Sequence, residues 1–188
     1  AGGNLVVEEK GLYSVEKFII ARRLMYWQVY LHKTTLAAEH MLISIIKRAR
    51  ELCQNGEQVF GSGPLLDFLS NDYGEKEFQT RPELLDLFSS LDDFDVLSAV
   101  KSWANHPDKT LSLLCKSLID RRLFKISISK SPPEPQQIES IKQRVSEQLG
   151  VELRLADYLV LTGKVWNSAY KVNENNIHIL FKDGRLTD

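Results

Sequence analysis

The first third of the chain carries a helical pattern of apolar and polar positions. From Ser14, a plausible helix N-cap with Glu16 in the first turn, helix formers continue without Gly or Pro until Asn55-Gly56. This pattern predicts one very long helix or two helices in line. We expect a bend or break at Thr34-Thr35, because neither residue favours helix and either hydroxyl competes for backbone hydrogen bonds.

Shorter helical patterns follow and predict an antiparallel bundle. After a loop at 61–64, apolar residues recur at helical spacing in the segments 65–70, 82–91, 93–105 and 109–123. His106-Pro107-Asp108 reads as a cap and turn between the last two. In the acidic stretch at 91–95, a helix cap at Asp92 or Asp93 is favoured over a cation site.

At Phe124 the period of the pattern changes from about 3.6 toward 2. Phe124, Ile126 and Ile128 alternate with polar residues before a Pro-rich stretch. We therefore predict two domains, a helical part at 1–123 and a small α+β subdomain at 124–188. Besides a strand-like Leu5-Val6-Val7, the expected later elements are a helix at 136–149 stopped by Gly150, strands at 158–161, 169–172 and 177–181, and a turn at Asp183-Gly184.

The predicted fold class is thus mostly α, a helical bundle built on a long N-terminal helix with a small α+β C-terminal subdomain.

Composition fits a globular protein, because 43% of the 188 residues are hydrophobic and 26% are charged. The balance of 24 basic and 25 acidic residues disfavours nucleic acid as a partner. No apolar run reaches the roughly 20 residues that span a bilayer, so we expect no membrane partner. The isolated Cys53 and Cys115 suit a reducing compartment, and the predicted location is cytoplasmic.

The chain opens with Ala1-Gly2-Gly3-Asn4 and has no initiating Met. It runs directly into an apolar, strand-like segment, as if it began in mid-protein. We expect a fragment or a cleaved product of a longer protein.

Four polar residues form one stripe on the first helix. At about 100° per residue, Arg22, Tyr26, Tyr30 and Lys33 fall within an arc of roughly 80°. Apolar residues flank this stripe on both sides, so we expect the helix to be buried on two faces: Ile20, Leu24, Trp27 and Leu31 on one, Phe18, Met25 and Val29 on the other.

On a buried helix, Arg22 and Lys33 would need carboxylates or bound anions, because desolvating an unpaired cation costs several kcal/mol. A polyphosphate would satisfy both, since the Arg fork matches phosphate oxygens and the Tyr hydroxyls donate at the next turns. The alternative is that acidic residues of neighbouring helices pair with the two cations and that the tyrosines are core aromatics. His32, on the Met25 flank, is by itself more typical of a packing residue than of a ligand.

The segment 22–33 resembles the long helix that follows the metal site in HD-domain dNTP triphosphohydrolases, which share an Arg, a Tyr eight residues later and a His-Lys pair. The resemblance implies that Arg22 holds the substrate triphosphate and that Tyr30 packs on the deoxyribose. It also implies that His32 and Lys33 reach toward the substrate phosphates or a nucleotide effector. Tyr26 stands where relatives carry a catalytic-site His. This difference from the family pattern affects which group contacts the substrate or the leaving group at this position.

A second segment, 121–125, resembles the Arg-x-Leu-x-Lys stretch that touches activator nucleotides across a subunit contact in regulated members of that family. The resemblance implies effector binding by Arg121 and Lys125 in a homo-oligomer. The alternative is that these basic residues merely complement the dipole of a helix C-terminus.

The resemblance also implies a divalent metal, such as Mg, Mn or Fe, held by a His, a His-Asp pair and a later Asp. This chain has no His-Asp dipeptide, and its four histidines are dispersed, at His32, His40, His106 and His178. We therefore expect the metal ligands in an HD segment upstream of Ala1, with no metal bound and no catalytic residue supplied by this chain. The chain alone is expected to be inactive.

The leading functional hypothesis is the C-terminal part of a metal-dependent enzyme that splits a deoxynucleoside triphosphate into deoxynucleoside and tripolyphosphate. The alternative is a non-catalytic nucleotide-sensing or oligomerisation module that uses Arg121, Lys125 and the C-terminal tail. A nucleic-acid-binding helical domain is a third and weaker hypothesis, because the charge is balanced.

Overall fold

The computed structural model describes residues 5–165 and 177–187. The chain divides into two compact units: a terminal unit of residues 1–36 and 163–188, and a central unit of residues 37–162. This division differs from the predicted boundary between residues 123 and 124. Phe124 packs against the hydrophobic core of the central unit, and so does Val145 of the following helix, so the chain does not leave that unit at residue 124.

A small sheet joins the two ends of the described chain in the terminal unit. Its strands are β1 (Val6–Glu8), β2 (His178–Leu180) and β3 (Leu186–Thr187), in the order β1-β2-β3. β1 runs parallel to β2, and β3 runs antiparallel to it. Gly184, at a φ of 83°, forms the turn before β3, a backbone conformation that glycine adopts without steric cost. The predicted strands at 5–7 and 177–181 and the predicted turn are confirmed.

The long helical stretch consists of two α-helices that follow one another in the chain, separated by a break. After a 3-10 turn, η1 (Glu9–Gly11), come α1 (Leu12–Met25), a π-helix, η2 (Tyr26–Tyr30), and α2 (Lys33–Gln54). The break lies at the π-helix and at Leu31-His32, so the predicted break at Thr34-Thr35 is two to three residues too late and both threonines lie in the first turn of α2. Ser14 is not the N-cap, because α1 begins at Leu12.

The central unit continues from α2 through six further α-helices and a 3-10 helix within the described residues. Their bounds are α3 (Gly63–Ser70), α4 (Glu75–Thr80), α5 (Glu83–Ser89), α6 (Asp93–Trp103), α7 (Lys109–Ile119), α8 (Pro135–Leu149) and η3 (Leu153–Tyr158). The pattern predicted each α-helix to within a few residues except the short α4. The described chain is thus mostly helical with one small sheet, which confirms the predicted fold class.

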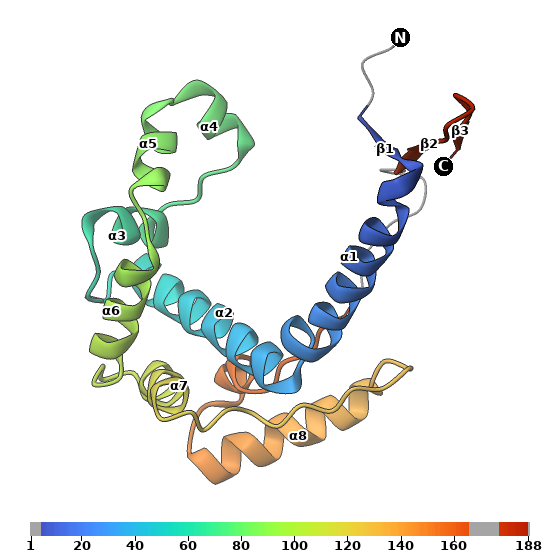
Figure 1. The fold of residues 1–188 in the computed structure, drawn as a ribbon. Coiled ribbons are helices and arrows are strands. Elements are labelled where there is room, and N and C mark those ends of the chain that lie inside the picture. The colour runs from blue at the N-terminus through green and yellow to red at the C-terminus, as the bar shows by residue number, and fades with distance from the viewer. Residues whose placement is uncertain (1–4, 166–176, 188) are drawn as a thin grey trace. The chain divides into compact units, whose positions relative to one another are not determined.

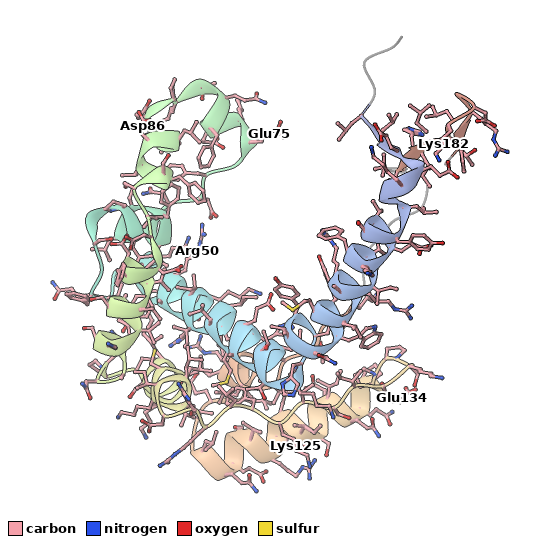
Figure 2. All side chains as sticks on the ribbon, in the orientation of Figure 1. Arg50, Glu75, Asp86, Lys125, Glu134 and Lys182 are labelled. Carbon is pink, nitrogen blue, oxygen red and sulfur yellow. The ribbon has the colours of Figure 1, made fainter. Side chains whose placement is uncertain are left out.

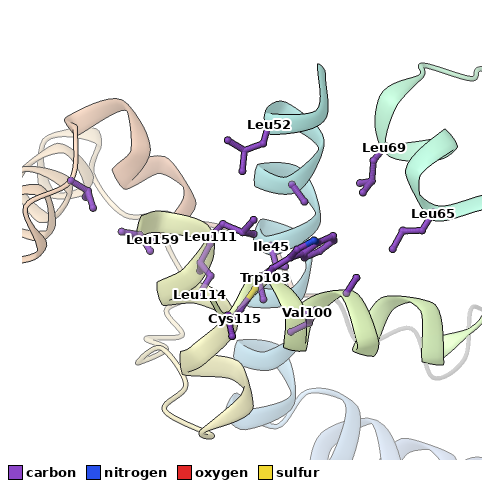
Figure 3. Packing of buried hydrophobic residues seen from close by; sticks show 14 residues of the cluster. Ile45, Leu52, Leu65, Leu69, Val100, Trp103, Leu111, Leu114, Cys115 and Leu159 are labelled. Carbon is purple, nitrogen blue, oxygen red and sulfur yellow. The ribbon is translucent and has the colours of Figure 1, made fainter. Parts of the chain in front are cut away.

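The core of the central unit is assembled from residues far apart in the sequence. Figure 3 shows Ile45 of α2 among side chains from α6, α7 and the segment after η3. Trp103 is 1% exposed, and its indole nitrogen donates to the Phe60 carbonyl at 2.8 Å. The buried members of this cluster are Ile45, Ala49, Leu52, Leu65, Leu69, Ala99, Val100, Trp103, Ala104, Leu111, Leu114, Cys115, Val151 and Leu159.

Polar caps define the ends of the core helices. The Asp92 carboxylate accepts from the amides of Phe94 and Asp95, at 2.8 and 3.1 Å, at the start of α6. The Asp108 carboxylate accepts from the Leu111 amide at 2.7 Å at the start of α7. Both caps were predicted. Gly150 ends α8 in the left-handed conformation, at a φ of 61°, as its position in the sequence indicated.

The predicted strand at 158–161 is absent, and the one at 169–172 lies outside the described residues. The segment 124–128 is extended but pairs with no described strand, and Tyr158 ends a 3-10 helix before an irregular stretch. Phe124 and Tyr158 pack on the helical core instead, so burial of these apolar residues did not require a sheet. The predicted strand at 169–172 is not among the residues that the structure describes. Within the described part of the chain, the helices are too short or too polar to cross a membrane.

Candidate functional site

The last turn of α1 and the π-helix η2 form the candidate site. A cavity of about 450 Å³ lies here within the terminal unit, lined by Phe18, Ala21, Arg22, Met25, Tyr26 and Tyr30. Three of the five predicted substrate-binding residues therefore lie around one cavity. Their spacing of four residues is the reason, since side chains four apart share a helix face.

Arg22, Tyr26 and Tyr30 form a column in which Tyr26 contacts the other two residues. The Arg22 guanidinium carbon lies 5.5 Å from the centroid of the Tyr26 ring, within the range of a cation–π interaction. Its Nη2 donates to the Tyr26 hydroxyl at 3.5 Å, which is long for a hydrogen bond, so the ring contact is the stronger of the two. The Tyr26 and Tyr30 ring centroids are 5.2 Å apart, with the planes tilted by 57°.

The backbone under this column is a π-helix, which is rare and occurs often at functional sites. The Leu31 amide donates to the Tyr26 carbonyl at 2.8 Å, five residues back, as a π-helix requires. The period of 3.6 used to predict the stripe therefore applies only as far as Tyr26. Lys33 lies beyond the interruption and does not line the cavity.

The predicted burial of this helix is wrong. None of the residues of α1 or η2 is buried, and Phe18, Leu24 and Trp27 are 63%, 50% and 57% exposed. Arg22 and Lys33 are exposed as well, and within residues 5–165 and 177–187 neither forms an ion pair. Because water solvates both cations, neither Arg22 nor Lys33 requires a bound anion for its stability. The alternative expectation, that carboxylates of neighbouring helices pair with these cations, is not met either.

His32 lies at the junction between η2 and α2. Its Nδ1 accepts from the Thr34 amide at 3.3 Å, and its carbonyl accepts from the Leu36 amide at 3.0 Å. This is the geometry of an N-cap, so the side chain satisfies one of the free amides at the start of α2. His32 does not line the cavity, but its Nε2 is not used by the cap.

The predicted effector residues lie at the end of α7, outside the candidate site. Arg121 is the one non-glycine among the described residues with a positive φ, 56°. Its amide donates to the Leu118 carbonyl at 3.2 Å, and the Arg122 amide donates to the Ser117 carbonyl at 2.8 Å, a Schellman motif. Glycine is usual at this position because it lacks a Cβ. Lys125 lies on the exposed segment that follows (Figure 2).

A buried ionic network in the central unit was not predicted. Arg48, 4% exposed, donates to Asp108 from Nη2 at 2.7 Å and from Nε at 3.2 Å, and also pairs with Glu51. Glu51 in turn accepts from the Tyr158 hydroxyl at 2.7 Å and from Arg154 at 3.2 Å. Sixty residues separate Arg48 from Asp108, so no local spacing could have revealed the pair.

The electrostatics of this network are those of a satisfied structural cluster. Hydrogen bonding to Asp108 holds the pKa of Arg48 above its ordinary value. Burial raises the pKa of Asp108, but its hydrogen bonds with Arg48 and the Leu111 amide outweigh burial and lower it overall. Burial and the bond to Glu51 raise the pKa of Tyr158 to about 12. The network therefore holds α2, α7 and η3 together, and its charged groups are already paired without a ligand.

A second hollow of about 560 Å³ lies in the central unit, lined by residues 58–60 and by Ser102, Trp103, Asn105, His106 and Pro107. His106 is occupied structurally, because its Nδ1 accepts from the Asp108 amide at 3.0 Å and its Nε2 lies 3.2 Å from the Gln58 carbonyl. The cap-and-turn interpretation of 106–108 is thus confirmed. Nowhere in the described ranges do three His, Cys, Asp or Glu side chains gather as a metal site would require.

Comparison with known proteins shows similarities to a family model, a bacterial protein and a solved structure. Residues 1–59 match the family model described as "HD associated region". The chain is 36% identical over 120 residues to the uncharacterized protein YwfO of Bacillus subtilis, an alignment that covers 64% of this chain and 26% of that protein. It is also similar along its full length to the crystal structure of a phosphohydrolase from Bacteroides thetaiotaomicron, with a TM-score of 0.89 and 45% sequence identity, and covers 46% of that chain.

These similarities associate the chain with HD-domain phosphohydrolases. The matched region of residues 1–59 includes α1, η2 and all of α2, and thus the whole candidate site. The chain spans less than half the length of the Bacteroides phosphohydrolase and about a quarter of the Bacillus protein.

Proposed function

We propose that this chain is the C-terminal part of a metal-dependent HD-family phosphohydrolase that converts a deoxynucleoside triphosphate into deoxynucleoside and tripolyphosphate. The observation that carries the proposal is the column of Arg22, Tyr26 and Tyr30 around one cavity, within the region that matches the HD-associated family model. The similarity to a phosphohydrolase structure that is 45% identical supports the reaction class. The choice of deoxynucleoside triphosphate rests on the resemblance of residues 22–33.

Each residue of the candidate site has a proposed role. The Arg22 guanidinium binds phosphate oxygens, for which its planar set of donors is suited. Tyr30, whose ring is half exposed at 53%, packs on the deoxyribose, where a 2′-hydroxyl would collide. Lys33 and the unused Nε2 of His32 lie at the start of α2 and attract the distal phosphates. Tyr26 completes the wall of the cavity.

We place the metal ligands in an HD segment that precedes Ala1 in the longer protein. A divalent ion such as Mg²⁺, Mn²⁺ or Fe²⁺ bound there would activate water or polarise a phosphoryl oxygen. The residues of this chain bind and orient the substrate, so the chain alone is inactive. Free Cys53 and Cys115 support a reducing, cytoplasmic location as part of the same proposal. The balanced charge supports a nucleotide rather than nucleic acid as the partner.

The test is release of tripolyphosphate from each of the four deoxynucleoside triphosphates, with Mg²⁺ or Mn²⁺. The full-length protein, its Arg22→Ala variant and the chain of residues 1–188 are assayed side by side. We expect activity in the first, loss of about 100-fold or more in kcat/KM in the second, since charge-assisted contacts to phosphate are strong, and none in the third. An Arg23→Ala variant, whose exposed side chain is outside the cavity lining, is the matched control and retains activity. A full-length protein that releases nothing from any nucleotide, alone or mixed, contradicts the proposal.

A second candidate function is nucleotide sensing with homo-oligomer formation. The observation that favours it is the left-handed backbone of Arg121, because such a conformation costs about 1 kcal/mol or more in a non-glycine residue and is retained where a side chain is needed. In this role Arg121 and Lys125 bind the phosphates of an effector nucleotide. Calorimetric binding of nucleotides to the chain of residues 1–188 without metal, with assembly followed by light scattering, tests it. Binding that survives Arg121→Ala and Lys125→Ala contradicts this assignment.

A further inference from the structure

We infer that Tyr26 is a positioning residue that orients the Arg22 guanidinium toward a phosphate ligand. The inference rests on the proposed function and assigns to Tyr26 a role through Arg22 rather than through its own contact with the substrate. The juxtaposition that carries it is an exposed arginine lying over a half-buried tyrosine ring that a second tyrosine supports.

Arg22 has little else to hold it. Its side chain is exposed, and among the described residues its hydrogen bond and its ring contact are both with Tyr26. An exposed arginine with several rotatable bonds loses side-chain entropy when it binds a ligand. A ring that already restricts the guanidinium reduces that loss, which is the benefit of preorganisation.

The ring contact leaves the functional edge of the guanidinium available. A cation over an aromatic face is held by the π system, whereas phosphate is bound by the in-plane N–H donors. The one hydrogen bond to the Tyr26 hydroxyl, at 3.5 Å, engages Nη2 only weakly. Tyr26 can therefore hold Arg22 and still leave donors for two phosphate oxygens.

Tyr26 is itself fixed from three directions. Its amide donates to the carbonyls of Arg22 and Arg23, and its carbonyl accepts from the Leu31 amide across the π-helical turn. Its ring rests against Tyr30, at 5.2 Å between centroids. The π-helix thus begins at the residue that holds the arginine, and a shift of that turn would move both.

The alternative is that the Tyr26 hydroxyl contacts the substrate directly. The two roles differ in which part of the side chain matters. Positioning through the ring predicts that Tyr26→Phe keeps most of the function and that Tyr26→Leu does not. A direct contact through the hydroxyl predicts that both variants lose it equally.

The experiment measures kcat and KM for tripolyphosphate release by the full-length protein and five variants: Tyr26→Phe, Tyr26→Leu, Arg22→Gln, the double variant Arg22→Gln/Tyr26→Leu, and Tyr13→Leu. We expect Tyr26→Leu to raise KM about fivefold, the upper value of an exposed cation–π contact, with kcat changed less than twofold. Tyr26→Phe, which keeps the ring, raises KM only about twofold. In the Arg22→Gln background, Tyr26→Leu has no further effect, because the group that it positions is gone. Tyr13→Leu replaces an aromatic residue of α1 that is 73% exposed and outside the cavity, and this variant behaves as wild type.

Two results overturn the inference alone: losses from Tyr26→Leu and Arg22→Gln that multiply in the double variant, or a Tyr26→Phe variant as impaired as Tyr26→Leu. A different result, Arg22→Gln with full activity, removes the proposed function of this site together with the inference. Thermal unfolding midpoints equal to that of the unsubstituted protein establish that each variant is folded. The three failures are therefore distinguishable from one another and from misfolding.

Discussion

Arg22 and Arg48 lie on the same helical stretch in opposite environments. Arg48 is 4% exposed and is bound by two carboxylates, whereas Arg22 is exposed and rests on a tyrosine ring. Burial makes the first pairing obligatory, because an unpaired charge in the core costs several kcal/mol. Arg22 on its tyrosine ring needs no carboxylate partner, and its guanidinium N–H donors remain accessible to water. Only the exposed arginine is available to an external anion.

Removing Arg48 should destabilise the central unit strongly. Arg48→Ala leaves Asp108 and Glu51 without their common cation, and we expect a loss of about 3–5 kcal/mol in the free energy of unfolding, measured in urea. Arg50→Ala on the same helix is the matched control. Its partner Asp72 is 89% exposed, so the loss there is below about 1 kcal/mol. Equal losses in the two variants would show that burial of the Arg48 network contributes nothing.

The same network predicts how stability depends on pH. Because the folded pKa of Asp108 lies below its unfolded value, the stability that it contributes is present above about pH 4 and is lost as pH falls through the folded pKa. The free energy of unfolding should therefore decrease as pH falls below about 4. Asp108→Asn should flatten this decrease, and urea titrations at successive pH values measure it. An unchanged slope in Asp108→Asn contradicts the assignment.

At the scale of elements, the end of α7 stores local strain that one substitution can release. Arg121 occupies the position of a Schellman motif where glycine is usual. Arg121→Gly should raise the free energy of unfolding by about 1 kcal/mol, while Arg121→Ala should leave it unchanged, because alanine keeps the Cβ. Chemical unfolding of both variants measures these two free energies of unfolding. If the effector assignment is correct, both variants also lose nucleotide binding, so the effect of backbone strain on stability is distinguished from the effect of the lost side chain on binding.

The elements that could be predicted are those with local signals. Asp92, Asp108 and Gly150 fix helix ends through contacts within a few residues, and each was identified from its neighbours in the sequence. The period-2 pattern at 124–128 was misleading because only Phe124 packs on the helical core, whereas Ile128 is 53% exposed, so the alternation does not mark a paired strand. The short α4 carries too few turns for a periodic signal.

The candidate site was predictable in part for the same reason. The i, i+4 spacing of Arg22, Tyr26 and Tyr30 brings them together whatever else the chain does. The π-helix was not predictable, because it depends on backbone hydrogen bonds that no residue type dictates, and it separates Lys33 from the column. The pairing of Arg48 with Asp108 depends on how distant helices meet in the folded chain, which spacing does not encode.

At the scale of the whole molecule, the two units differ in how much of a core each contains. All buried members of the hydrophobic cluster belong to the central unit, between Ile45 and Leu159. Neither α1 nor η2 contributes a buried residue. Burial of apolar surface supplies most of the stability of a fold. The central unit therefore contributes most of the free energy of unfolding of the described chain.

A shortened chain of residues 32–162 should therefore fold independently. It keeps His32 as the cap of α2, the whole hydrophobic cluster and the Arg48 network, while it lacks α1, η2 and the sheet. We expect cooperative urea unfolding with a midpoint close to that of residues 1–188, together with complete loss of binding to inorganic tripolyphosphate. The matched variant is residues 1–188 with Arg22→Ala, which should bind tripolyphosphate no better than the shortened chain while retaining the sheet. If residues 32–162 unfold without cooperativity, the central unit depends on the terminal unit for its stability. If they bind tripolyphosphate as well as residues 1–188 do, the phosphate site lies in the central unit, and Arg121 with Lys125 becomes the better location for it.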